Sequence, residues 1–212
     1  MIKQIAIGIF SFLMFQTHAY TQGKYLEDDK GLSFGVAGSI SKTDNNFARS
    51  WALYGTNCKN MEMGISLPTV NVIFDNNDGT DGETKKINAI SPYFEIFMRR
   101  DEKHPVSVSV SFSYLRYLKK DFKNHFLAVS ASTFRDVNLN RGFSVIPEFG
   151  ITKSIMTGSS KDEPLIFSLA LGLSADLGVF SALITPQFSI QDGTTSSGLS
   201  LSFVFSPNQS SK

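Results

Sequence analysis

Three glutamates are the residues of this sequence best placed for chemistry, because each alternates with apolar neighbours. Glu62, Glu95 and Glu148 follow this pattern, and residues two apart in a strand share a face. We therefore expect all three on the polar face of a sheet. Arg99 has the parity of Glu95, and an enclosed charge is costly unless it is paired. These four residues predict an internal network of glutamate and arginine, which would gate the interior or, as we favour, fill it structurally together with water.

Two histidines, His104 and His125, are the remaining candidates for catalysis. His104 falls in a charged turn and His125 begins a strand. No serine or acid stands at an obvious triad spacing from His125, so a polar interfacial residue is the favoured interpretation. The acidic stretch 75–83 misses the register of an EF-hand, because Gly79 occupies the fifth position counted from Asp75, where a ligand is required. We expect no enzyme activity, no metal and no cofactor.

The elements that must position these residues are strands, and residues 105–116 show the pattern most clearly. Val108, Val110 and Phe112 alternate with serines, which predicts one apolar and one small polar face. A phase slip at Pro68 predicts a bulge. The pattern recurs in ten segments, which predicts ten strands. The alternative is eight strands, if the segments around Trp51 and His125 do not both span the membrane. The ten segments are 31–41, 49–57, 61–74, 87–99, 105–116, 125–134, 143–152, 165–174, 180–189 and 199–205.

The N-terminus has the features of a cleaved signal peptide. Lys3 precedes an apolar run over residues 5–15, and residues 17–19 offer a small-x-small cleavage site. Export leads to an oxidising compartment, yet Cys58 is the only cysteine, so no intrachain disulfide forms. No later stretch approaches 18 apolar residues, which excludes a helical membrane protein. The net charge of +1 shows no footprint of nucleic-acid binding.

The composition of the two faces favours a membrane over a soluble sheet. The polar face is mostly Ser, Gly, Thr and Ala, which is too polar for a sandwich core and lacks the Lys and Glu of a solvent-exposed face. Strands of about 9–14 residues have the length of tilted strands that cross a bilayer. Aromatic residues near strand ends, such as Trp51 and Tyr114, are typical of interfacial girdles. We predict an all-β fold, a closed antiparallel up-and-down transmembrane β-barrel of ten strands.

These features resemble small bacterial outer-membrane β-barrel proteins of the OmpA-barrel, OmpX and OmpW type. The closing strand, with Leu199, Leu201, Phe203 and Phe205 on its apolar parity, resembles the insertion signal of those families, although seven residues follow Phe205. The resemblance implies a bacterial outer-membrane location and contact with outer-membrane lipid and the barrel-insertion machinery. The predicted organisation is a signal peptide (1–19), a periplasmic lead-in (20–30), the barrel domain (31–206) and a short tail (207–212).

The expected role is non-catalytic and belongs to one of three kinds. They are envelope structure, surface interaction and passage of solutes through a narrow pore. An extracellular ligand or surface partner would bind the loops predicted at 42–48, 75–86, 157–164 and 191–197. The alternatives are a lipid-modifying outer-membrane barrel enzyme, which requires His125 beside a serine and an acid, and a soluble periplasmic β-barrel that binds a ligand.

Overall fold

The structure is a computed structural model that describes Leu26 and residues 31–43, 46–74, 83–98, 106–118, 125–140, 142–157 and 165–207. The predicted signal peptide, the lead-in apart from Leu26, Arg99, His104 and the acidic stretch over residues 75–82 lie outside the described residues. They stay predictions. Within the described part of the chain, no helix is long and apolar enough to cross a membrane.

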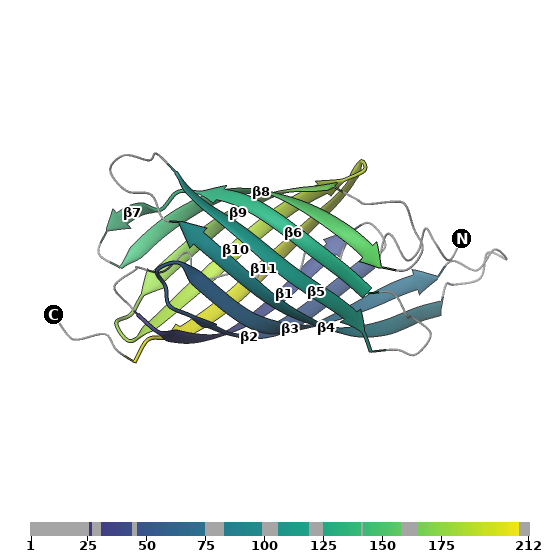
Figure 1. Cartoon of the computed structure of the whole chain (residues 1–212), viewed down its shortest axis with the longest axis horizontal. Helices are drawn as coiled ribbons and strands as arrows, with labels where there is room; N and C mark the ends of the chain where they lie inside the picture. The colour runs from purple at the N-terminus through teal and green to yellow at the C-terminus, as the bar shows by residue number, and fades with distance from the viewer. Residues whose placement is uncertain are drawn as a thin grey trace.

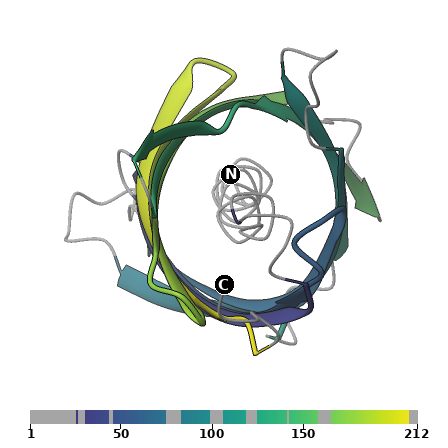
Figure 2. The same cartoon turned by 90° about the vertical axis from the view of Figure 1, so that its left-hand side faces the viewer.

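Ten strands close into one antiparallel barrel, as predicted. Each strand pairs with its neighbours in the chain, and the last pairs with the first, so the wall has no free edge (Figures 1 and 2). The short strand β7 pairs only with the first residues of β8, and the rest of β8 pairs directly with β6, so β7 adds no further strand to the ring. The strands are β1 (Ser33–Thr43), β2 (Asn46–Thr56), β3 (Met61–Phe74), β4 (Glu83–Met98), β5 (Ser107–Tyr117), β6 (His125–Phe134), β7 (Val137–Asn140), β8 (Phe143–Thr157), β9 (Leu165–Asp176), β10 (Phe180–Gln191) and β11 (Thr194–Phe205).

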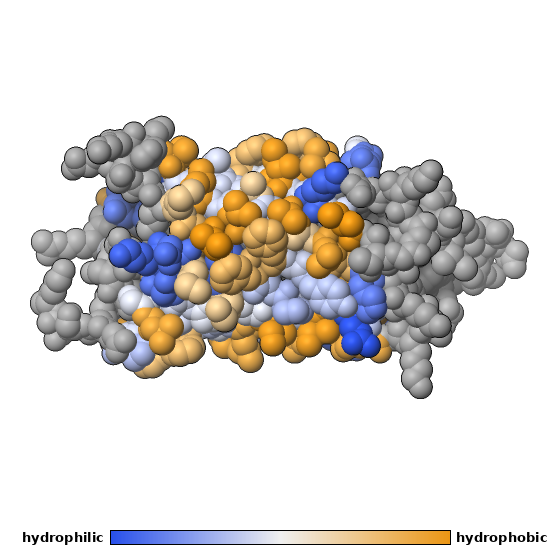
Figure 3. Space-filling view, in the orientation of Figure 1, coloured by the Kyte–Doolittle hydropathy of each residue, from blue (hydrophilic) through white to orange (hydrophobic). Residues whose placement is uncertain are grey.

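Alternation along each strand gives the wall an apolar outer face and an inner face of mainly small polar residues, which also carries a cluster of buried apolar side chains, Phe97, Phe134, Ile146 and Leu183. In β5, Ser107, Ser109 and Ser113 are buried on the inside, whereas Val110 and Phe112 are exposed on the outside. The serines therefore point inward, as predicted. Figure 3 shows the result on one side of the molecule, where apolar side chains form a band across the middle and hydrophilic side chains lie near both of its ends.

The bulge predicted at Pro68 is wrong. The pairing of β3 with β2 runs through Pro68 without a shift, and β3 pairs with β4 in one register on both sides of it. The contacts with β4 are interrupted only between Ser66 and Thr69. The missing N–H of proline thus removes part of a ladder without inserting a residue. Since the parity does not change, Val70 is buried on the inner face.

The barrel has two ends that differ in their connections. We call the end where β1 begins and β11 finishes the terminal end, and the opposite end the distal end.

The loops predicted at 42–48 and 191–197 are wrong. Only two residues separate β1 from β2, and only two separate β10 from β11. Asp192 and Gly193 both have positive φ, 47° and 80°, which is the two-residue turn that suits a twisted hairpin. The loops predicted at 75–86 and 157–164 also belong to the distal end. Both connections are shorter than predicted, because β4 already begins at Glu83 and β8 continues to Thr157.

Candidate functional site: the interior of the barrel

Two of the predicted site residues, Glu62 and Glu95, lie side by side on the inner face. They are direct cross-strand partners in the pairing of β3 with β4, and their exposed fractions are only 1% and 2%. Tyr93, on the same face of β4, donates a hydrogen bond from its hydroxyl to Oε1 of Glu62 over 2.9 Å. A buried carboxylate needs such donors, because its desolvation is otherwise costly. The structure thus assembles a carboxylate pair near the terminal end.

The third glutamate, Glu148, lies on another part of the wall. It is half-buried on the inner face of β8, opposite Phe134 on β6 and Ala170 on β9. Strands β5 and β6 stand between it and Glu95. The structure therefore brings Glu62 and Glu95 together and places Glu148 apart from them. The remaining member of the predicted network, Arg99, lies outside the described residues.

Over the inner face as a whole, small hydroxyl side chains are the commonest lining residues. Representative contacts join Ser109 Oγ to Ser132 Oγ at 2.8 Å, and Ser66 Oγ to the carbonyl oxygen of Ser91 at 3.3 Å. Away from the rims, the inward-facing charged side chains that the structure describes are the three glutamates. The strand lysines and arginines whose side chains the structure describes are exposed, on the outer parity of their strands, and they are Lys42, Arg49, Lys86, Arg116 and Lys153.

A row of alternating glycines and tyrosines crosses the inner wall beside the carboxylate pair. Gly35, Tyr54, Gly64 and Tyr93 are successive cross-strand partners on β1, β2, β3 and β4. Each tyrosine ring lies over the glycine of a neighbouring strand, since a Cβ built at Gly64 would come within 2.8 Å of Tyr93 Cε1 and a Cβ at Gly35 would collide with the ring of Tyr54. The hydroxyl of Tyr54 forms a hydrogen bond with Ser202 on β11.

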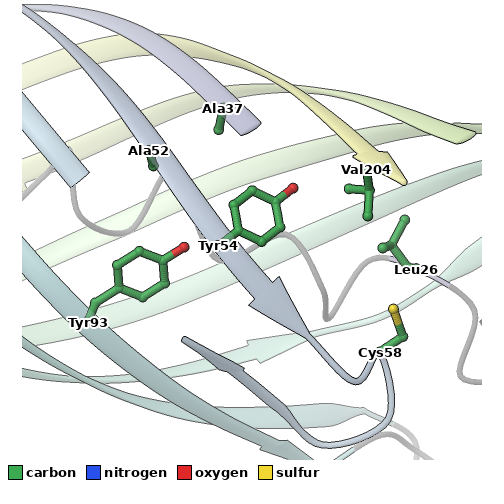
Figure 4. Close-up of a cluster of buried hydrophobic side chains, with 7 residues drawn as sticks. All are labelled: Leu26, Ala37, Ala52, Tyr54, Cys58, Tyr93 and Val204. Atoms are coloured by element: carbon green, nitrogen blue, oxygen red, sulfur yellow. The ribbon is translucent and has the colours of Figure 1, made fainter. Parts of the chain in front are cut away.

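Figure 4 shows both rings among buried side chains that include Leu26, Cys58 and Val204. This row was not predicted from the sequence. Inward-parity glycines and tyrosines were its only signal, and they become neighbours only once the strand registers are known.

His125 lies on the outer face at the distal end, away from the inner glutamates. Its Nδ1 is 2.8 Å from the hydroxyl of Tyr114 on β5, and the two rings stack with centroids 5.7 Å apart. An aromatic pair at the end of a strand is typical of a membrane interface. Among the described residues, no group of three or more His, Cys, Asp and Glu side chains forms a metal site.

The closing strand presents its predicted apolar residues outward. Leu199, Leu201, Phe203 and Phe205 are exposed on the outer face of β11. Phe205 pairs with Phe34 on β1 and with Phe180 on β10, and the Phe180 and Phe205 rings are 5.2 Å apart. The geometry is that of the strand which completes the barrel, and its role as an insertion signal stays a prediction.

Comparison with known proteins finds similarity in structure only. No family model and no curated protein matches the sequence. Similar solved structures include an outer-membrane channel from Pseudomonas putida F1, with a TM-score of 0.50, 11% identity, and coverage of 82% of this chain and 95% of that one. The beta domain of the Bordetella autotransporter Brka has a TM-score of 0.48 and 10% identity, covering 83% of this chain and 98% of its own. The translocator domain of the autotransporter NalP from Neisseria meningitidis has a TM-score of 0.46 and 9% identity, covering 94% and 97%.

Proposed function

We propose that this chain, a closed barrel with the fold of bacterial outer-membrane β-barrels, is an integral protein of the bacterial outer membrane, that it has no catalytic role, and that its narrow lumen passes small solutes with a preference for cations. The observation that carries the proposal is the division of the wall into an apolar outer face and a hydroxyl-lined inner face that bears carboxylates.

The outer face supports the membrane location. Large apolar side chains are exposed on every strand of the barrel, and examples are Trp51 and Leu53 at 67% exposure and Met98 at 67%. Soluble monomers rarely expose contiguous apolar patches of more than a few hundred Å². In a lipid bilayer these apolar side chains contact acyl chains and are not exposed to water. The hydrophilic residues that border the apolar band would then lie at the level of the lipid headgroups (Figure 3).

The inner face supports passage of small solutes. A barrel of about eight strands is just filled by ordinary side chains, so ten strands whose inner face is mainly Ser, Gly and Ala favour a lumen. This lumen is narrow where the buried side chains of Phe97, Phe134, Ile146 and Leu183 pack together inside. A cation passing at about 5 Å from a carboxylate gains about 1 to 3 kcal/mol, depending on the effective dielectric constant. Three inward carboxylates therefore favour cations over anions.

Reversal potentials across a planar bilayer test this proposal. The refolded full-length protein should conduct and select cations over anions under a salt gradient. The double variant Glu62→Gln/Glu95→Gln should lower the permeability ratio of cation to anion several-fold, and Glu148→Gln should lower it further. The variant Lys153→Gln is the matched control, because it removes a charge from the outer face and should leave the ratio unchanged.

Two results would overturn the proposal. The first is a barrel that is folded, as judged by heat-modifiable migration on a gel, but does not conduct ions. This result would contradict the passage of solutes through the lumen. Recovery of the protein in the soluble periplasmic fraction would remove the membrane location and favour a soluble ligand binder. Cell fractionation also permits N-terminal sequencing of the mature protein, which we expect to start at Tyr20 after removal of residues 1–19.

The alternative role, a lipid-modifying barrel enzyme, depends on His125. The hydrogen bond and stacking of this residue with Tyr114 support an interfacial position in place of a catalytic one. We therefore expect the lipid A of cells that overproduce the protein to keep an unchanged mass spectrum. A new acylated or deacylated species that disappears with His125→Ala would establish the enzyme instead.

A further inference from the structure

The outer surface along β1 carries two hollows, one between β1, β10 and β11 and the next between β1, β2 and β11. The one nearer the distal end has a volume of about 300 Å³ and is lined by Lys42, Thr195 and Ser197 among others. The next is an apolar groove of about 370 Å³ lined by Ile40, Gly38, Trp51, Leu199 and Leu201, with Arg49 at its side. Lys42 pairs with Ser197, and Ile40 pairs with Arg49 and Leu199, so the two hollows are contiguous in register.

The groove exists because Gly38 has no side chain. Gly38 is opposite Trp51 on β2 and Leu201 on β11, and a Cβ added to it would stand 3.0 Å from Cζ3 of the Trp51 ring. The indole ring therefore lies over the glycine and forms one side of the groove. Leu199 and Leu201 on β11 form the other side. A larger side chain at position 38 would occupy the groove.

The two hollows differ in chemistry. The first is lined by Lys42, which carries an ammonium group, and by the hydroxyl residues Thr195 and Ser197. Arg49 lines the second and pairs with Ile40, two residues from Lys42 along β1. Both cations are exposed, and no acidic residue is among the described residues that line either hollow. Cations and hydroxyls bind phosphate oxygens, and Arg does so with two parallel hydrogen bonds. Beyond these donors, the lining towards the middle of the barrel is apolar.

This order of groups matches that of one kind of molecule, a lipid with a phosphate headgroup. We propose that the surface binds one acidic, phosphate-bearing lipid, with its phosphate between Lys42 and Arg49 and an acyl chain along the groove over Gly38. The inference rests on the proposed membrane location and is independent of passage through the lumen.

Native mass spectrometry of the full-length barrel in detergent tests the site. With phosphatidylglycerol as the probe, we expect one lipid to be retained per barrel, and we expect phosphatidylcholine, whose choline neutralises its phosphate, to bind at least tenfold more weakly. The variant Lys42→Gln/Arg49→Gln should weaken binding of phosphatidylglycerol at least tenfold. The variant Gly38→Leu should weaken it by filling the groove while leaving both cations in place. Lipid A carries the same two chemical groups, and tighter binding of lipid A than of phosphatidylglycerol would support the same site.

Several results would overturn the inference. Equal retention of phosphatidylcholine would mean that the anionic charge is not recognised. Lys153 is an outward-facing lysine on β8. If Lys153→Gln weakened lipid binding as much as Lys42→Gln/Arg49→Gln does, binding would be spread over the whole charged surface. Displacement of the lipid by an equal concentration of inorganic phosphate would mean that the groove contributes nothing. Conductance should be unchanged in Lys42→Gln/Arg49→Gln, so failure of this site and failure of the pore are distinguishable, and heat-modifiable migration confirms that each variant is folded.

Discussion

Replacing Gly64 with alanine should destabilise the barrel, because the inner wall is packed onto this residue. A Cβ at position 64 would lie 2.6 Å from the carbonyl oxygen of Leu53, 2.8 Å from Tyr54 Cβ and 2.8 Å from Tyr93 Cε1. All three distances are shorter than ordinary van der Waals contacts. The ring of Tyr93 can turn aside, but the other two atoms belong to or adjoin the backbone of β2. Strand β2 must therefore move relative to β3.

The magnitude follows from two opposing effects. Overpacking of this kind costs about 1 to 3 kcal/mol, and the involvement of backbone atoms places Gly64→Ala near the upper value. Alanine also reduces the conformational entropy of the unfolded chain relative to glycine, which stabilises the folded state by about 0.4 to 1 kcal/mol. We expect a net loss of about 2 kcal/mol, which lowers the ratio of folded to unfolded protein roughly 30-fold.

The assay is equilibrium urea unfolding of the purified barrel in detergent micelles, followed by tryptophan fluorescence and by heat-modifiable migration. With a denaturant slope of about 2 kcal/mol per molar, the midpoint should fall by about 1 M. The matched control is Gly55→Ala on β2, where the nearest atoms to the added Cβ are 3.9 Å away. This control should be neutral or slightly stabilised, because it keeps the entropic gain without the clash.

Equal midpoints for Gly64→Ala and Gly55→Ala would refute the packing argument. A double-mutant cycle of Gly64→Ala with Tyr93→Ala adds a second check. If the ring of Tyr93 contributes to the clash, the two changes together should cost less than the sum of the single changes, by about 0.5 kcal/mol or more. Strict additivity would leave the Leu53 and Tyr54 contacts as the whole cause.

Two further predictions concern single interactions. Tyr54→Phe removes the hydrogen bond with Ser202 while keeping the ring, so the free energy of unfolding should fall by about 1 kcal/mol; an equal loss for Tyr54→Phe in a Ser202→Ala background would contradict that pairing. Gly193→Ala places a side chain at a φ of 80° and should cost about 1 to 2 kcal/mol in the same urea assay, whereas Asp192→Asn, which suits the same turn, should be close to neutral.

The two-faced strands were predictable because alternation is a local property. Ser107 and Ser109 face inward and Val110 faces outward as their parity requires, and the same rule put Glu62, Glu95 and Glu148 on the inner face. The predicted boundaries failed at 42–48 and 191–197, where short polar side chains resemble a loop by composition. The Asp192-Gly193 pair was a signal of a tight hairpin, and it would have corrected the second of these loops.

The arrangement of the site was beyond local patterns, because it depends on register. Glu62 meets Glu95 only in one alignment of β3 with β4, and the connection between these strands contains two Asp-Gly pairs, at 78–79 and 81–82, which do not single out one register. The row of Gly35, Tyr54, Gly64 and Tyr93 requires three such alignments at once. The separation of Glu148 from the other two depends on the order of strands around the whole barrel.

Closure of the wall between β1 and β11 has a consequence for the path of folding. Ser33 Oγ and Ser206 Oγ are 2.7 Å apart at this junction, yet 173 residues separate them in the chain. Every other pairing in the ring joins consecutive wall strands, so it can form as a local hairpin. Bringing the two ends together from an unpaired chain costs about 4 to 5 kcal/mol of loop entropy, so β1 and β11 should join last. Until they do, both are open edges able to recruit a neighbouring chain, and this junction is the place where assembly competes with aggregation.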